Sequence, residues 1–383
     1  MDLSEFSDIA PFTDEEAAAA LTRLSNHPNT KWVSKFIFPD KPEGFLGEVL
    51  RSIHTVDEFQ GVVMSKAINW VVDTSMKEYT YDGFEKLQNL KRKYVAMSNH
   101  RDIILDPALT QITLQRYHMP ETQICVGDNL LKVKSVELLI RSNRMIKVIR
   151  GISARELYLS SQLLSRYIRE TVTSGTASVW IAQRQGRTKD GLDTTEQGLL
   201  KMLDMSGTGD FVQNFMDLNI IPISISYEYE PCDILKAREL LISRTRKYVK
   251  GETEDLESIM MGIKQYKGNV HLSIDDPLTE EEIRAAADCD KNDRYQLIRH
   301  AVDRRIISGY KLWKTNYMAY DMVNGCKKYA DRYTAEDLET FKSYIAQRLL
   351  MVEPSLNKHE LRDIFLHIYS NPVLSKEQLT DSQ

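Results

Sequence analysis

Six short apolar runs, separated by longer segments, constrain the fold of this chain more than any other feature. They lie at residues 94–97, 123–126, 145–149, 177–182, 220–226 and 269–274. Each run has the length of a buried strand, and most of the segments between them have helical length and spacing. Strands that alternate with helices form βαβ units. We therefore predict an α/β fold whose mostly parallel, mixed sheet is covered by helices.

The segments on either side of these runs are expected to be helical. Residues 1–90 carry apolar side chains at helical spacing, and Thr13 and Glu16 are placed as a capping box. Residues 279–383 return to helical patterns. The chain is thus expected to have three parts: a helical accessory region at 1–90, an α/β domain at 91–278 and a helical C-terminal extension at 279–383.

The composition is that of a globular protein without a strong charge bias. The 383 residues are 42% apolar and carry a formal net charge of −5. Nucleic-acid-binding domains usually have a basic excess, so we expect no nucleic-acid partner. No apolar run is long enough for a membrane-spanning helix. The four cysteines are too far apart for a zinc motif or a disulfide scaffold, which favours a cytoplasmic protein without a metal site.

Polar side chains follow the first apolar run directly. His100 comes just after the expected strand end, and Asp102 and Asp106 follow it closely. A carboxylate beside a histidine fixes the ring tautomer and stabilises the protonated ring, so that the second nitrogen can take a proton from an alcohol. His100 is therefore a candidate general base, although a structural loop histidine would show the same pattern.

Two later runs end in cations. The third run leads into Arg150, and the fourth is followed by a glycine-containing loop with Arg187, Thr188 and Lys189. Guanidinium groups bind phosphate in a bidentate way, and glycine lets backbone amides approach it, so this loop suits a phosphate as well as it suits a solvated turn. In open α/β sheets ligands bind beyond the carboxyl ends of the strands, where these clusters are expected to lie.

In their order along the chain, these blocks resemble the motifs of the glycerol-phosphate acyltransferase family. That family has a His–Asp motif after a strand, a strand ending in Arg, a Glu-Gly-x-Arg type loop and a proline-containing strand. The matching blocks here are Asn99-His100 to Asp106, Val148-Ile149-Arg150, Gly186-Arg187-Thr188 and Ile221-Pro222-Ile223. Two further segments, 126–130 and 224–228, are similar to segments of the subgroup that acts on glycerol 3-phosphate and dihydroxyacetone phosphate. The resemblance covers about residues 90–275.

The spacing of the first block departs from the family pattern. The family usually has four residues between His and Asp, but here Asp106 comes one residue later. Asp106 also precedes Pro107, as a helix N-cap residue would. Both Asp106 and Asp102 therefore stay candidates for the carboxylate partner of His100.

The resemblance implies an acyltransferase that moves a fatty acyl group from acyl-CoA or acyl-carrier protein to the hydroxyl of glycerol 3-phosphate, in phospholipid synthesis. His100 would be the general base and the substrate hydroxyl the nucleophile, and no cofactor would be needed. The expected acceptor ligands are Arg101, Arg150, Arg187, Thr188 and Lys189. Because the product partitions into lipid, contact with the inner face of the cell membrane is implied, with region 1–90 as the candidate docking surface.

Two alternatives stay open. A lysophosphatidate acyltransferase, or another lipid acyltransferase, would carry the same blocks. The third block also departs from the family, since its Glu is replaced: Arg184 and Gln185 stand three and two residues before Arg187. This replacement and the altered His–Asp spacing favour a catalytically weak acyltransferase-like protein that binds lipid or a carrier protein.

Overall fold

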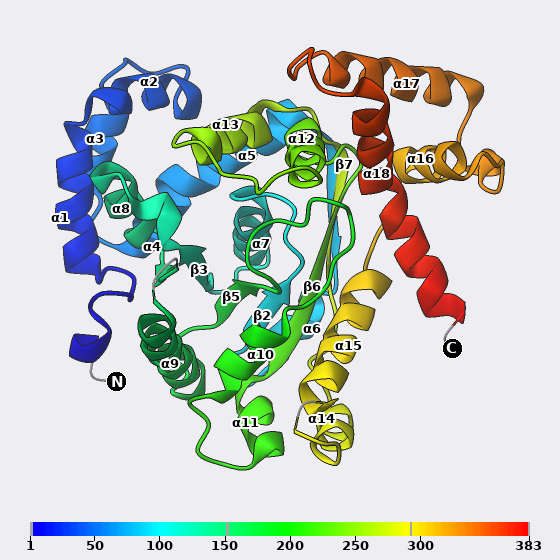
Figure 1. The fold of residues 1–383 in the computed structure, drawn as a ribbon. Helices are drawn as coiled ribbons and strands as arrows, with labels where there is room; N and C mark the ends of the chain where they lie inside the picture. The colour runs from blue at the N-terminus through cyan, green and yellow to red at the C-terminus, as the bar shows by residue number, and fades with distance from the viewer. Residues whose placement is uncertain (1–2, 151–152, 292, 382–383) are drawn as a thin grey trace.

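The computed structural model describes residues 3–150, 153–291 and 293–381. Within these ranges a seven-stranded sheet, in the order β1-β7-β6-β2-β5-β3-β4, is covered by helices on both faces (Figure 1). The strands are β1 Met76–Asp82, β2 Val95–Ser98, β3 Gln123–Gly127, β4 Met145–Val148, β5 Val179–Ala182, β6 Ile220–Tyr227 and β7 Gly268–Ile274. Strands β2 to β6 run parallel, whereas β7 runs antiparallel to β6 and parallel to β1. The predicted α/β fold with a mixed, mostly parallel sheet is confirmed.

The central strand shows why the apolar runs were informative. Val95 and Met97 of β2 pack into the core on one face of the sheet, and Ala96 packs into the core on the other. All three are fully buried, because helices cover both faces. A strand buried on both faces has no polar positions, so it reads as a continuous apolar run.

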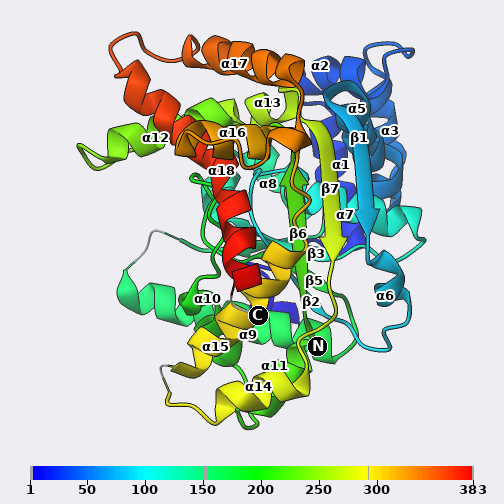
Figure 2. The same ribbon diagram turned by 90° about the vertical axis from the view of Figure 1, so that its right-hand side faces the viewer.

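The prediction that residues 1–90 are helical is wrong at β1. This strand lies at the edge of the sheet, beside β7 (Figure 2). Its residues Lys77 and Glu78 are exposed, and only Met76 is fully buried. Charged side chains are common on edge strands, where they discourage pairing with other chains. They also remove the apolar run by which the other strands could be recognised.

The N-terminal helices form a small core, which Leu138 joins from a later helix, and then lead into the sheet. They are α1 Asp14–Ser25, α2 Pro28–Ile37, α3 Phe45–Ser52, α4 Val56–Phe59 and α5 Ser65–Ser75. Leu21, Phe38, Leu46 and Phe59 are the centre of this core. The Thr13 capping box at the start of α1 is confirmed.

The remaining helices cover the sheet or stand beside it. They are α6 Phe84–Gln88, α7 Leu105–Arg116, α8 Lys134–Arg141, α9 Ala154–Thr173, α10 Gln197–Asp204, α11 Phe211–Leu218, α12 Asp233–Ser243, α13 Glu254–Lys264, α14 Glu280–Ala287, α15 Asp293–Ser308, α16 Lys314–Asn324, α17 Ala335–Leu349 and α18 Lys358–Asp381. Helices α14 and α15 share a core with the sheet through Ile283 and Ile298. Helices α16 to α18 instead pack with α12 around Phe341 and Phe365. The C-terminal part is thus not one uniform extension.

Of the helices that the structure describes, none combines the length and the hydrophobicity needed to span a bilayer.

Candidate active site

The loop that carries His100 is fixed against the centre of the sheet. Asn99, which precedes it, is fully buried at the carboxyl end of β2. Its side-chain amide donates to the Ile225 carbonyl at 3.0 Å and accepts from the Ile225 amide at 2.8 Å, which ties the loop to β6. On the other side, the Thr188 amide donates to the His100 carbonyl at 2.7 Å. The loops after β2 and β5 are therefore held together next to the histidine.

His100 is paired with Asp106. Its Nδ1 lies 2.9 Å from Asp106 Oδ2, and the Asp106 side chain is fully buried whereas that of His100 is 15% exposed. The carboxylate also accepts from the backbone amides of Arg101 and Asp102 and from the Tyr227 hydroxyl. A carboxylate can only accept, so Nδ1 carries the proton and Nε2 is left as the nitrogen that can take one.

Asp102 has a different role. Its Oδ1 accepts from the backbone amides of Ile104 at 2.9 Å and Leu105 at 2.8 Å, which closes the turn that leads into α7. The turn that Asp102 closes takes up the additional residue between His100 and Asp106. The structure thus places Asp106 on the histidine and Asp102 in the turn before α7.

We expect Asp106→Asn to lower kcat by roughly 10- to 100-fold and Asp102→Asn to leave it nearly unchanged. An amide at position 106 cannot stabilise a protonated imidazole by charge. The side-chain oxygen of an asparagine at position 102 can still accept from the two turn amides. Turnover of both purified variants, with thermal melts to confirm folding, tests this. A larger loss in Asp102→Asn would assign the partner role to that residue.

Arg187 is a buried cation of the site that is only partly satisfied. It is 9% exposed in the loop after β5, and its Nη1 has no hydrogen-bond partner among the described residues. It lies beside the Cys232 thiol and within electrostatic range of Asp255. A buried N–H without a partner is costly. An anionic ligand that accepts this bond would remove the cost and gain a charge-assisted contact.

Arg150 lies at the end of β4, where the sequence predicts it. The guanidinium of Arg150 packs directly against Gly127. A Cβ added at Gly127 would lie only 2.8 Å from the guanidinium carbon. Arg150 lines a cavity of about 190 Å³ together with Lys147 and Arg184. Glu196 lines the same cavity, so a carboxylate is present here although the family's third-block Glu is not.

Three of the expected acceptor ligands are engaged with protein carboxylates instead. The Arg101 guanidinium is buried and donates to Asp193 at 2.7 Å. The Thr188 hydroxyl donates to Asp193 at 2.6 Å, and Lys189 forms an ion pair with Glu239. These contacts build the framework of the loops, and the structure does not bring the three side chains together as open ligands for an anion.

Asp193 is the residue of this framework that sequence reasoning missed. It accepts hydrogen bonds from Asn99, Arg101, Thr188 and Tyr310. Burial alone would raise the pKa of Asp193, but the Arg101 charge and these hydrogen bonds hold it below its usual value. A single aspartate in an irregular segment has no spacing or motif that would have marked it.

An apolar cavity adjoins the histidine loop. It has a volume of about 120 Å³ and is lined by residues of α5, α7, β3 and α8, with Ile103 and Ile104 of the histidine loop in its wall. Most of the lining residues are apolar, and the polar ones are Ser65, Gln111, Gln115, Glu121 and Asn143. A hollow of this composition suits a hydrocarbon chain.

Glu121 is the only ionisable side chain among the described residues that line this cavity, and burial raises its pKa to about 7. Its pKa in an unfolded chain is about 4.3. At a pH between these two pKa values, Glu121 is protonated in the folded protein and ionised in the unfolded chain. The contribution of Glu121 to the free energy of unfolding therefore falls as the pH rises from about 4 to about 7.

We therefore expect Glu121→Gln to gain roughly 1–3 kcal/mol in unfolding free energy, relative to the unsubstituted protein, between pH 5 and pH 7.5. Urea unfolding at both pH values measures the difference, with the exposed Glu85→Gln as the matched control. A difference that does not change with pH would show that Glu121 is ionised at both values.

Within the described ranges, no cluster of three or more His, Cys, Asp or Glu side chains is placed to bind a metal ion.

No family model and no curated protein matches the sequence. Among solved structures, the crystal structure of the 1-acyl-sn-glycerophosphate (LPA) acyltransferase PlsC from Thermotoga maritima matches with 14% identity and a TM-score of 0.40. The match covers 76% of this chain and 94% of that one. A similarity of this size does not define an activity, so the functional conclusion comes from the site itself.

Proposed function

We propose that the protein is an acyltransferase that moves a fatty acyl group from a thioester to the hydroxyl of a glycerophosphate. The observation that carries this proposal is the contact between His100 and the buried Asp106, at the carboxyl edge of the parallel strands. The partly unsatisfied Arg187 in the adjoining loop supplies a place for the acceptor phosphate.

In this reaction His100 Nε2 takes the proton of the acceptor hydroxyl, and Asp106 stabilises the protonated ring. The hydroxyl oxygen attacks the thioester carbonyl and forms the new C–O bond, and the C–S bond then breaks. The proton passes from His100 to the departing sulfur, which leaves as a thiol. The substrate itself is the nucleophile, so the mechanism needs neither an acyl-enzyme intermediate nor a cofactor beyond the thioester co-substrate.

The acceptor phosphate would be bound by Arg187 and Arg150. Glycerol 3-phosphate, the acceptor implied by the sequence resemblance, carries this group next to a free hydroxyl. Lysophosphatidate carries the same group and one acyl chain. The cavity that Arg150 lines also has apolar walls, including Ile9, Leu164 and Met202, and this observation favours lysophosphatidate as the second candidate.

The proposal is tested with radiolabelled acyl-CoA and acyl-carrier protein as donors and both glycerophosphates as acceptors. Chromatography of the lipid products should show a labelled ester with at least one pair, and the acceptor used identifies the substrate. If no pair gives a labelled ester, the chain is not an acyltransferase for these acceptors, and a role in binding lipid or a carrier protein remains.

A further inference from the structure

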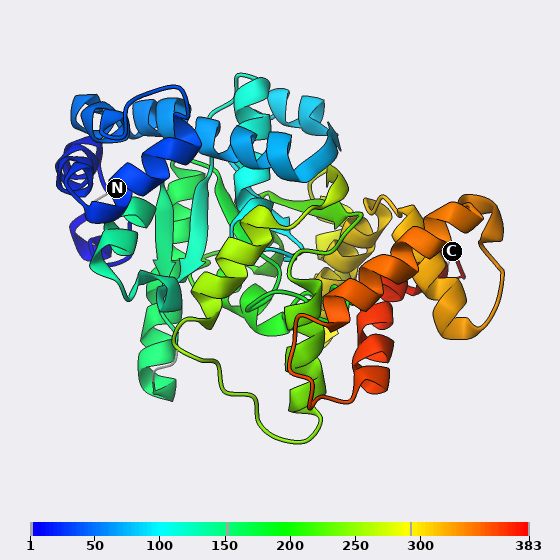
Figure 3. The same ribbon diagram turned by 90° about the horizontal axis from the view of Figure 1, so that it is seen from above.

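Exposed apolar side chains project from one side of the molecule at three places in the described chain. The first is the N-terminal end of α9, which stands away from the rest of the protein (Figure 3). Every residue from 153 to 159 is exposed. They include Leu157, Tyr158 and Leu159, at 47%, 55% and 54% exposure. Consecutive apolar residues at such exposure usually mark a contact surface.

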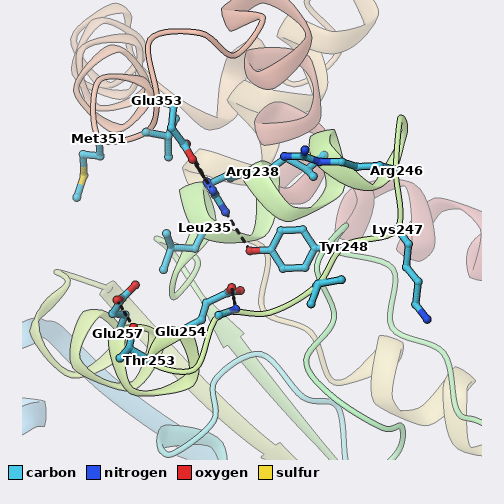
Figure 4. Close-up of a pocket in the computed structure, with 14 residues that line it drawn as sticks. Leu235, Arg238, Arg246, Lys247, Tyr248, Thr253, Glu254, Glu257, Met351 and Glu353 are labelled. Carbon is cyan, nitrogen blue, oxygen red and sulfur yellow. Dashed lines mark hydrogen bonds and ion pairs between the residues drawn. The ribbon is translucent and has the colours of Figure 1, made fainter.

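The other two places flank a hollow of about 730 Å³ between α12, α13 and the turn after α17 (Figure 4). On the loop between α12 and α13, Val249 is 79% exposed. On the turn between α17 and α18, Leu350 is 83% exposed and Met351 is 55% exposed. Figures 2 and 3 show this loop, this turn and the end of α9 on the same side of the molecule. We call these three groups the apolar tips.

Cations without partners accompany the apolar tips. Arg246 and Lys247 line the hollow, and in the part of the chain that the structure describes neither forms an ion pair (Figure 4). Arg155 is exposed on the first turn of α9, beside the first tip. Apolar and tyrosine side chains next to Lys and Arg match the chemistry of an anionic lipid surface, where the former enter the interface and the latter meet the phosphates.

The apolar tips adjoin the proposed acceptor site. Leu157 of α9 lines the cavity that contains Arg150. In the loop between α12 and α13, Lys250 donates to Asp255 at 2.7 Å, and the other Asp255 oxygen accepts from Asn129 at 2.9 Å. A lipid surface on the tips would therefore lie beside the proposed acceptor site.

We propose that the three apolar tips dock this protein on an anionic lipid surface. This places docking on α9, the 244–253 loop and the 350–353 turn, rather than on region 1–90 as the sequence suggests. The inference deepens the proposed function, because the lipid surface would receive the product. Vesicle binding needs no acyl donor, however, so it can be measured separately.

The full-length protein is sedimented with vesicles of phosphatidylcholine, with and without phosphatidylglycerol. We expect binding to the anionic vesicles, weakened by salt, and little binding to the neutral ones. Lys247→Glu should lower the affinity by roughly tenfold or more, since each cation near such a surface contributes about 1 kcal/mol. Val249→Asp and Tyr158→Asp should also weaken binding. The matched controls are Lys291→Glu, an exposed lysine in the segment between α14 and α15, and Val62→Asp, a valine that is 44% exposed.

Equal binding by Lys247→Glu and the unsubstituted protein, equal binding to both kinds of vesicle, or no binding would overturn the proposal. Self-association that Tyr158→Asp abolishes would overturn it as well, because the tips would then join two copies of this chain. Transfer of a short, water-soluble acyl group without vesicles should be unchanged in Val249→Asp. If the unsubstituted protein lacks that activity but binds anionic vesicles, the proposed function fails and the docking surface stands.

Discussion

Replacing His100 by alanine is expected to lower acyl transfer by about 10²–10⁴-fold, the usual cost of removing a general base. The side chain contacts Asp106 through Nδ1 and is partly exposed at the edge of the sheet. We expect the fold to survive the loss of the ring, because Asn99 and Thr188 also hold the loop. Steady-state turnover of the purified variant measures the effect, and circular dichroism confirms that the fold is kept.

The matched control is His359→Ala, which removes an exposed histidine from α18. We expect this variant to keep the turnover of the unsubstituted protein. A His100→Ala variant with near-normal turnover would rule out the general-base mechanism, whatever the effect on substrate binding.

Arg187→Ala is expected to raise the KM for the phosphorylated acceptor by about tenfold or more and to change the KM for the acyl donor little. A hydrogen bond to a charged group contributes about 1.5–3 kcal/mol, which corresponds to tenfold or more in binding. The Arg187 Nη1 has no partner in the described chain, so the acceptor would supply one. Initial rates with each substrate varied in turn separate the two KM values.

Two further variants sharpen this experiment. Arg187→Lys should recover only part of the affinity, because an ammonium is a point charge without the planar fork of a guanidinium. Arg362→Ala removes an exposed arginine from α18 and should change neither KM. An unchanged acceptor KM in Arg187→Ala would remove this residue from the phosphate site and leave Arg150 as the candidate.

The six strands from β2 to β7 could be predicted because each keeps a short apolar run. This holds even for β4 at the other edge of the sheet, where Ile146 is fully buried. Strand β1 could not, since Lys77 and Glu78 are accommodated at the exposed edge of the sheet. Whether a strand is at an edge depends on the order of strands in space, and the pattern within a single strand does not contain that order.

The candidate site could likewise be predicted only in part. The block order predicts where His100, Arg150 and Arg187 lie, because each follows the end of a parallel strand. Which cations stay open to a ligand could not be predicted, since Asp193 neutralises Arg101 from a segment without motif or periodicity. Likewise the choice between Asp106 and Asp102 depended on how the turn between them closes.

The most direct test of the central claim is acceptor-dependent release of the free thiol from an acyl thioester. With either acyl-CoA or acyl-carrier protein as donor, the unsubstituted protein should release thiol only when glycerol 3-phosphate or lysophosphatidate is present. The amount released should equal the ester formed, and His100→Ala should abolish both. Thiol release that needs no acceptor and yields free fatty acid, or no release with any donor and acceptor, would contradict an acyltransferase in which the acceptor hydroxyl is the nucleophile.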